Sequence, residues 1–460
     1  MPRGGSVPAH DATSDDLQRL DRFPFVVVSW VDDDGYPISV ATDFRTDAAA
    51  GVVALRQPAG ETLVLPTDRE VNVCGSHIRP KPGEGYDERR YLQLWGTAGT
   101  ADAGGQVMFR PTRAWGWDEQ EVPFFEYSER SVPQSRHYLA QLSAEKGRVI
   151  RPRLAAGWLF LRTTRLPFLS ATFVPVLLGI AIAAHHRAFD PWLALLTILG
   201  GAFAHLGINV ANDIFDTLSG ADEATVNPTQ FSGGSRVLIY DLLTLRQLVA
   251  LDAALFGAAI LIGLALVWLT GSMLLLAIGA AGVLIGLAYT APPLKLVYRG
   301  LGEIAVALGF GPVMLLGAYV VQTGRLSWEA AVASVPVAIH IALVLYVNEI
   351  PDRTGDAAAG KRTLPVRLPA NVVTNAYLVA ALGAFAVIVV GVAIGLLPPF
   401  TLLALAAVPL AFRVYRGIGA NYTSPYALMG FMGLNVNLHL LTGIGLLLGY
   451  AVAVVVAQVR

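Results

Sequence analysis

The chain has 460 residues, of which 54% are hydrophobic and 15% are charged, and its formal net charge is −1. This apolar share, with a mean hydropathy of +0.54, exceeds that of ordinary soluble domains and predicts a membrane protein. A net charge near zero gives no reason to expect nucleic acid as a partner. The single cysteine, Cys74, excludes an intramolecular disulfide framework.

Residues 1–150 are predicted to form a soluble domain, because charged residues are interspersed there with short apolar runs. Runs such as 25–30, 38–42 and 71–74 are separated by turn signals, a spacing typical of a small antiparallel β-barrel. We expect residues 151–165 to be a linker and residues 166–460 to form an all-α membrane bundle. The fold class is therefore multi-domain, with a polytopic bundle preceded by a small β-barrel-like domain.

Nine apolar runs follow residue 165, each long enough to cross about 30 Å of hydrocarbon as a helix of about 20 residues. The residues around Pro398-Pro399 form either a hairpin between two helices or one broken helix, and we count two. The predicted spans are 166–185, 192–212, 247–269, 272–290, 303–322, 328–350, 373–397, 399–415 and 431–457.

Basic residues gather in the loops on one side of these spans, against only Arg187 and Arg325 on the other. Loops rich in Lys and Arg normally stay in the cytoplasm. The sequence therefore predicts a multi-pass protein of the cell membrane, with the N-terminal domain and the polar loops on the cytoplasmic side.

Two acidic motifs adjoin the apolar runs. The first is Asn209-Val-Ala-Asn212-Asp213-Ile-Phe-Asp216, and the second runs from Asn348 to Leu364. Steps of three and four residues place the polar side chains of each motif on one face of a helix. Carboxylates beside lipid-length segments are costly and point to function. The expected Mg²⁺ ligands and catalytic carboxylates are Asp213, Asp216, Asp352 and Asp356.

Two polar loops lie between the motifs, 220–236 and 289–303. Glycines, hydroxyls and basic side chains in such loops can surround phosphate oxygens. Either loop alone could be a topological anchor or a lipid-headgroup contact. Their convergence with both motifs at one end of the bundle instead predicts a diphosphate site. The expected substrate-binding residues are Asn209, Asn212, Arg236, Tyr289, Lys295, Arg299, Asn348, Lys361 and Arg362.

These residues suit the ionisation of a prenyl diphosphate. Mg²⁺ held by carboxylates and phosphate oxygens, together with fixed cations, would stabilise the charge that develops on the leaving diphosphate. An apolar bundle would shield the allylic cation from water.

The combination of Asn212-Asp213-x-x-Asp216 with Asp352-x-x-x-Asp356-x-x-x-Gly-Lys-Arg-Thr-Leu, and Tyr289-x-x-Pro-Pro-x-Lys295 between them, resembles the UbiA superfamily of intramembrane aromatic prenyltransferases. The resemblance covers residues 158–458. It implies a nine-helix bundle, Mg²⁺ dependence, and transfer of an isoprenoid group from its diphosphate to an acceptor.

Within the superfamily, the tract 348–368 is most similar to the dihydroxynaphthoate polyprenyltransferases of menaquinone biosynthesis. The first motif departs from the form Asn-Asp-x-x-Asp-Arg, because Thr217 follows Asp216. The resemblance implies 1,4-dihydroxy-2-naphthoate as the acceptor and leaves another lipid or secondary-metabolite acceptor open.

The N-terminal domain resembles, over about 80 residues, the flavin-binding split-barrel proteins related to pyridoxamine phosphate oxidase. The resemblance rests on an apolar strand, the turn 33–37 and a second strand. It implies FMN or a related flavin as a cofactor. Arg79, Lys81, Arg89 and Arg90 could contact the flavin phosphate or form an ordinary solvated face. The aromatic cluster is expected to pack in the core, or to serve as a lid or a docking surface for the membrane; it consists of Trp115, Trp117, Phe124, Phe125 and Tyr127.

Two other classes of function stay open. A secondary transporter with an accessory soluble domain would also carry carboxylates in a bundle, although its ion sites would lie in broken helices at the membrane midplane. A flavin reductase with a membrane anchor would need far fewer than nine helices.

Overall fold

The structure is a computed structural model that describes residues 9–56, 63–81, 85–121, 136–152, 155–225, 229 and 231–459, without the side chains of residues 81, 85–87, 167, 458 and 459. The chain divides into two compact units, Met1–Gln141 and Leu142–Arg460. Each unit has its own hydrophobic core.

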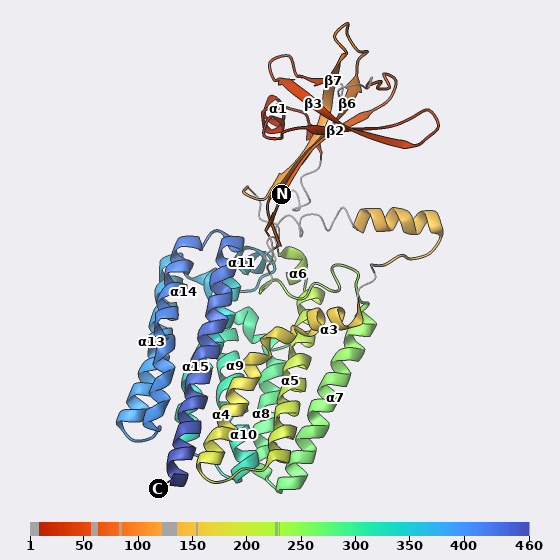
Figure 1. Ribbon diagram of the computed structural model, residues 1–460. Coiled ribbons are helices and arrows are strands. Elements are labelled where there is room, and N and C mark those ends of the chain that lie inside the picture. The colour runs from red at the N-terminus through yellow and green to blue at the C-terminus, as the bar shows by residue number, and fades with distance from the viewer. Residues whose placement is uncertain are drawn as a thin grey trace. The chain divides into compact units, whose positions relative to one another are not determined.

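The N-terminal unit is an antiparallel sheet with the strand order β1-β7-β4-β3-β2-β5-β6, in which β6 also pairs with β7 (Figure 1). Alternate residues of β2, such as Val26 and Val28, are fully buried, as the pleat of a half-buried strand requires. Helix α1 (Ser14–Leu20) is capped by Thr13. The strands are β1 (His10–Asp11), β2 (Val26–Val31), β3 (Pro37–Asp47), β4 (Val52–Arg56), β5 (Val71–Lys81), β6 (Gly85–Ala98) and β7 (Gln106–Asp118).

The basic residues expected at a flavin phosphate have carboxylate or aromatic neighbours. Arg79 pairs with Glu88 at 3.0 Å, Arg89 pairs with Glu119, and Arg90 lies over a phenylalanine ring. The Lys81 side chain and the aromatic residues 124, 125 and 127 lie outside the described part of the chain. The sheet confirms a separate β domain, and its assignment to the flavin-binding split barrels stays a prediction.

The C-terminal unit is a helical bundle (Figure 1). Short 3₁₀ segments at Leu166–Leu169, Leu296–Arg299 and Pro399–Ala407 precede α4, α9 and α14, and a π-helical segment at Gly309–Val313 joins α9 to α10. The helices are α3 (Ala156–Thr164), α4 (Ser170–His185), α5 (Pro191–Leu218), α6 (Ala221–Ala224), α7 (Leu245–Thr270), α8 (Met273–Thr290), α9 (Gly302–Leu308), α10 (Met314–Thr323), α11 (Trp328–Ala358), α12 (Leu364–Arg367), α13 (Ala370–Ala393), α14 (Val408–Asn421) and α15 (Pro425–Val459).

Eight helical segments of the described chain are long and apolar enough to cross a membrane, where the sequence predicts nine. The difference lies in the first predicted span, 166–185. Its first four residues form a 3₁₀ turn, which leaves α4 with 16 residues. At a rise of about 1.5 Å per residue, α4 is about 24 Å long and falls short of the hydrocarbon thickness.

Both acidic motifs lie on helices, as their spacing predicts. Helix α5 extends to Leu218, six residues beyond the predicted end of its apolar run, and α11 extends to Ala358, eight residues beyond. Each helix therefore continues into the polar sequence, and the carboxylates lie on its final turns.

Several glycines in the bundle mark close helix crossings. A Cβ on Gly179 of α4 would lie 2.4 Å from the carbonyl oxygen of Leu315 in α10. A Cβ on Gly449 of α15 would lie 2.6 Å from the backbone of Thr401. Small residues allow such approaches between membrane helices, so these glycines serve packing.

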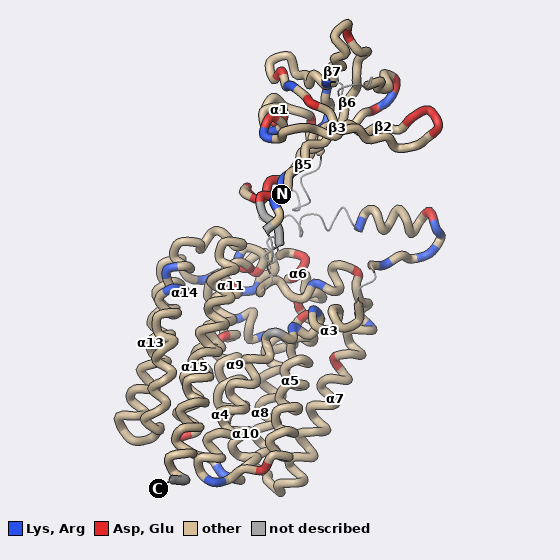
Figure 2. The backbone as a smooth tube through the Cα atoms, viewed as in Figure 1, with Lys and Arg blue, Asp and Glu red and all other residues tan. Residues whose placement is uncertain are grey.

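Charged residues of the bundle gather at one end, where α6 and the last turns of α5 and α11 meet (Figure 2). The long middle parts of the helices carry few of them. This distribution is the one expected for a bundle whose polar site lies at one membrane face.

Candidate active site

The four motif carboxylates lie near the C-terminal ends of α5 and α11. Asp216 and Asp356 are each in the last turn of their helix, where the helix dipole is unfavourable to negative charge. Asp213, Asp216 and Asp356 are also buried. Such carboxylates need compensating donors and cations, and the structure supplies both.

Asp213 is held from two directions. The Arg165 guanidinium donates to its Oδ1 at 2.6 Å, and the backbone N–H of Ser235 lies 3.2 Å and 3.1 Å from its two oxygens. Burial alone would lower the pKa of Arg165, but the charges of Asp213 and Asp222 raise it above its usual value. Arg165 therefore remains a cation at the site.

Asp216 is the meeting point of three side chains. Its Oδ1 accepts a hydrogen bond from the Tyr298 hydroxyl at 3.0 Å, and its Oδ2 accepts from Asn212 at 3.2 Å and from Lys361 at 3.4 Å. Burial and the charge of Asp216 raise the pKa of the Tyr298 hydroxyl to about 12, so it stays a donor at neutral pH.

Lys361 links the two motifs. Its ammonium group lies 3.4 Å from Asp216 on α5 and 3.8 Å from Asp356 on α11. Burial would lower the pKa of Lys361, but these two carboxylates hold it well above its usual value. One buried cation thus neutralises part of the negative charge on both helices.

Asp352 has one carboxylate oxygen that receives a donor and one that does not. Its Oδ2 accepts from the backbone N–H of Gly233 at 2.9 Å. Its Oδ1 is buried and has no hydrogen-bond partner within the described residues. A buried carboxylate oxygen without a partner is costly, unless a cation or ligand supplies one.

Asp222 shows how much negative charge the site concentrates. Its carboxylate accepts from Thr217 at 3.0 Å, beside the two carboxylates of the first motif. Burial, then the charges of Asp213 and Asp216, raise the pKa of the Asp222 carboxyl to about 7. The carboxyl is therefore partly protonated near neutral pH.

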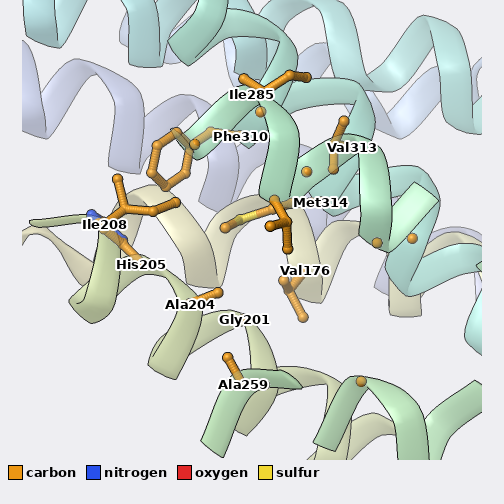
Figure 3. Close-up of a pocket in the computed structure, with 18 of the residues that line it drawn as sticks. Val176, Gly201, Ala204, His205, Ile208, Ala259, Ile285, Phe310, Val313 and Met314 are labelled. Atoms are coloured by element: carbon orange, nitrogen blue, oxygen red, sulfur yellow. The ribbon is translucent and has the colours of Figure 1, made fainter. Parts of the chain in front are cut away.

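A cavity of about 730 Å³ opens beside the carboxylates. At its polar end the lining includes Arg165, Asn209, Asn212, Tyr289 and Asn348. Farther in, the walls are mainly apolar side chains from α5, α7, α8, α10 and the π-helical segment, some of which Figure 3 shows. The space therefore combines a polar end, which includes the cation Arg165, with a hydrocarbon-like interior.

The other predicted cations point to different partners. Arg236 donates to the carbonyl of Asp222 and to Tyr240, and Lys295 lies 5.0 Å from the ring centre of Tyr298. Arg299 and Arg362 are exposed, and the Arg299 guanidinium donates to a backbone carbonyl. The structure thus brings Lys361 to the carboxylates and leaves Arg299 and Arg362 on the surface.

Three features of the site are missed by reasoning from sequence. Neither Arg165 nor Tyr298 is among the substrate-binding residues expected from the sequence. The backbone N–H groups of Gly233 and Ser235 belong to a loop expected to surround phosphate oxygens, but they donate to the carboxylates of Asp352 and Asp213. Residues 226–228 and 230 of this predicted loop lie outside the described part.

The carboxylates suit Mg²⁺ in chemistry, although they are not assembled as a metal cage. In the described part of the chain, no group of three or more His, Cys, Asp and Glu side chains is arranged to hold a metal ion. Mg²⁺ commonly takes one or two protein carboxylates and fills its other positions with water and substrate phosphates. The free Oδ1 of Asp352 fits that mode of binding.

Comparison with known families agrees with this arrangement. The model of the UbiA prenyltransferase family matches residues 172–456. The chain belongs to the UbiA prenyltransferase family. It is thus a prenyltransferase with a multi-pass helical domain, joined to an N-terminal β-sheet unit that lies outside the matched region.

Individual members of the UbiA family show the extent of the similarity. The chain is 27% identical to a 2-carboxy-1,4-naphthoquinone phytyltransferase from Synechocystis sp., covering 64% of this chain and 92% of that protein. It is 27% identical to a 1,4-dihydroxy-2-naphthoate octaprenyltransferase from Bacillus subtilis, covering 67% and 99%. A UbiA homologue from Archaeoglobus fulgidus, solved with GPP and Mg²⁺, is 13% identical with a TM-score of 0.47, covering 63% and 99%.

Proposed function

We propose that this UbiA-family protein transfers a polyprenyl group from its diphosphate to an aromatic quinone precursor such as 1,4-dihydroxy-2-naphthoate. The observation that carries the proposal is the pair of carboxylate helices, bridged by Lys361, beside an apolar cavity whose polar end is lined by Asn212 of α5 and Asn348 of α11. Two similar proteins named for prenylation of naphthalene-type acceptors support the choice of acceptor class.

The diphosphate would bind at the polar end of the cavity. Arg165 and Lys361 are the cations in contact with the carboxylates there, so we assign them the diphosphate oxygens ahead of the exposed Arg299 and Arg362. Asn209 and Tyr289, which line the same end, would orient the diphosphate or the acceptor. Fixed donors aimed at a developing anion stabilise the leaving group as the carbon–oxygen bond breaks.

Mg²⁺ is part of this proposal. Asp352, with its unpartnered oxygen, would be its main protein ligand, and Asp213, Asp216 and Asp356 complete the carboxylate set. When bound, Mg²⁺ supplies positive charge to the diphosphate oxygens.

The apolar part of the cavity would hold the isoprenoid chain and keep water from its reactive carbon. The bond between the prenyl C1 and the diphosphate oxygen breaks, and its electron pair leaves with the diphosphate. A nucleophilic ring carbon of the acceptor then bonds to C1, and that ring carbon loses its proton or carboxyl group. A site without water favours this route over hydrolysis.

The test is transfer of a radiolabelled geranylgeranyl group to 1,4-dihydroxy-2-naphthoate by the detergent-purified full-length protein, with and without Mg²⁺. The critical variant is Asp352→Asn, which keeps the size of the side chain and an acceptor for Gly233. Glu223→Gln is the matched control, because Glu223 is an exposed acid on the neighbouring helix α6.

We expect product with the wild type and with Glu223→Gln, and a loss of about 100-fold or more with Asp352→Asn or a chelator, the size seen when one preorganised charge-stabilising group is removed. Diphosphate release that depends on Asp352, without prenylated naphthoate, would move the assignment to another acceptor. The absence of both prenylated product and diphosphate release would contradict the proposed function and favour transport.

The proposal places the charged end of the bundle at the cytoplasmic face. Basic residues are abundant at that end and rare at the other (Figure 2). Cysteines introduced into the Cys74→Ala background at Arg362 and at Arg325 should differ in labelling by an impermeant maleimide added to intact cells. Only the cysteine at position 325 should react.

A further inference from the structure

Two polar side chains, His205 and Thr197, line the apolar part of the cavity, away from the carboxylates. His205 is on α5, eight residues before Asp213, which corresponds to about 12 Å along the helix axis. It lines the cavity beside Ile208, and its ring meets Phe310 edge to face, with ring centres 4.7 Å apart (Figure 3). Thr197, another polar lining residue of this part, already donates to the carbonyl of Leu193.

The partner of His205 fixes its tautomer. The Thr172 hydroxyl lies 2.8 Å from Nδ1 of His205, and both residues are buried. In several other threonines of the bundle, such as Thr164 and Thr442, the hydroxyl donates to the carbonyl four residues earlier. The Thr172 hydroxyl has no such bond in the described residues, so Nδ1 of His205 is the acceptor available for its proton.

If Nδ1 carried the proton instead, the Thr172 hydroxyl would be a buried donor without an acceptor, which is unfavourable. The arrangement that satisfies both groups has Nδ1 as acceptor and the proton on Nε2. In the described part of the chain, no side chain accepts a hydrogen bond from Nε2 of His205. Nε2 is also not one of the fully buried polar atoms that lack a partner, so it is accessible from the cavity that His205 lines. His205 therefore presents an N–H donor to the cavity.

The chemistry of the two substrates decides what this donor meets. An isoprenoid chain is a hydrocarbon and offers no acceptor atom, and the diphosphate belongs with the cations at the polar end. A hydroxylated or quinone-type aromatic ring does carry oxygen acceptors. A donor oriented by a second residue in an apolar pocket is also a typical means of selecting a ligand oxygen.

We infer that the Nε2–H group of His205, oriented by Thr172, donates to a ring oxygen of the aromatic acceptor and positions the ring beside the prenyl C1. This assignment rests on the proposed function and names the acceptor subsite within it. Phe310, held edge to face by the same imidazole, forms an apolar wall next to the ring. His205 and Thr172 are thus residues that determine acceptor specificity.

The test compares steady-state kinetics of the full-length protein with His205→Leu, His205→Gln and Thr172→Val. Geranylgeranyl diphosphate is the donor, and the acceptors are a panel of hydroxylated naphthoates, benzoates and quinols. We expect His205→Leu to raise the acceptor KM by about 10- to 100-fold, as for loss of a hydrogen bond from a buried donor, and to change the diphosphate KM by less than about twofold.

His205→Gln keeps an N–H donor on a side chain of similar reach and should recover most of the acceptor affinity. Thr172→Val removes the group that fixes the tautomer, so its acceptor KM should lie between those of the wild type and His205→Leu. The thermal midpoint of each variant, measured without substrates, shows whether the bundle is intact.

Three results would overturn the inference. An unchanged acceptor KM in a folded His205→Leu, or a rise in the diphosphate KM alone, would show that the imidazole does not meet the acceptor. A His205→Gln variant as impaired as His205→Leu would exclude the donor role. Failure of the wild type to prenylate any member of the panel would instead overturn the proposed function, and this inference with it.

Discussion

The two acidic motifs are similar in sequence but differ in how their oxygens are used. On α5, Asp213 and Asp216 have both oxygens occupied by protein donors. On α11, one oxygen of Asp352 has no partner in the described part of the chain, and Asp356 has Lys361 at 3.8 Å as its cation. The first motif is therefore already organised by the protein, whereas the second retains ligand positions for a cation or substrate.

This difference predicts that changes around the first motif act mainly on stability and changes in the second mainly on binding. Lys361 is the exception, because it contacts both helices. Variants of Lys361, Arg165, Asp352 and Tyr298 test this difference between the two motifs, with expected effects that decrease in that order.

Lys361→Met should have the largest effect. It leaves Asp216 and Asp356 without their shared cation, and it removes positive charge from the diphosphate site. We expect kcat/KM for prenyl transfer to fall by about 100- to 1000-fold, as for loss of one preorganised charge-stabilising donor. Lys361→Arg should retain part of the activity. A loss below about threefold in the Met variant would show that the bridge is dispensable.

Arg165→Ala should destabilise the bundle, because it leaves the buried carboxylate of Asp213 without its ion-pair partner. Breaking one partner of a buried ion pair costs about 3–5 kcal/mol, and this figure is an upper bound here because part of Arg165 is exposed. Denaturant unfolding in detergent measures the loss.

The matched control for this prediction is the double variant Arg165→Ala with Asp213→Asn. It also removes the negative charge of Asp213, which the single variant leaves buried without a partner, so it should recover part of the stability. A single variant as stable as the wild type would remove the distinction drawn between the two motifs.

Asp352→Asn should act in the opposite way. Since one oxygen of Asp352 has no partner among the residues that the structure describes, the change should alter the free energy of unfolding little. It should raise the Mg²⁺ concentration for half-maximal activity by about 10-fold or more, within the range seen for altered metal sites. Mg²⁺ titration of residual activity measures the shift. Equal Mg²⁺ dependence in variant and wild type would exclude Asp352 as a ligand.

Tyr298→Phe should have the smallest effect. It removes the hydrogen bond to Asp216, which keeps Asn212 and Lys361 as donors, and the contact of the hydroxyl with Ser219. A loss of about 1 kcal/mol, or roughly fivefold in kcat/KM, is typical of one such bond. A much larger loss at unchanged stability would indicate that the hydroxyl contacts substrate directly.

The sequence predicts much of the helical unit, because span length and three- and four-residue spacing are local properties. The apolar runs locate the bundle, and the spacing correctly places Asp213 with Asp216 and Asp352 with Asp356 on helices. The span 166–185 is helical as predicted, but hydropathy does not distinguish the 3₁₀ turn at Leu166–Leu169 from the first turn of an α-helix, so α4 itself has only 16 residues.

The partners of the carboxylates are harder to predict, since they depend on contacts distant in sequence. Arg165 meets Asp213 across 48 positions, and Lys361 meets Asp216 across 145. The sequence alone does not rank the basic residues near the motifs as diphosphate ligands. Only the fold shows that Lys361 contacts the carboxylates, whereas Arg299 and Arg362 are exposed. The tautomer of His205 likewise depends on Thr172, on a different helix.

Gly355 in the second motif bears on attempts to redesign this site. A Cβ there would lie 2.8 Å from both the carbonyl oxygen of Ala224 and the Cα of Thr225, just after α6. Even alanine would push apart the backbone of α11 and the segment that follows Asp222. A library that randomises residues 352–356 to change substrate preference should keep glycine at 355, because the backbones of α11 and of the segment after α6 are too close there for any side chain.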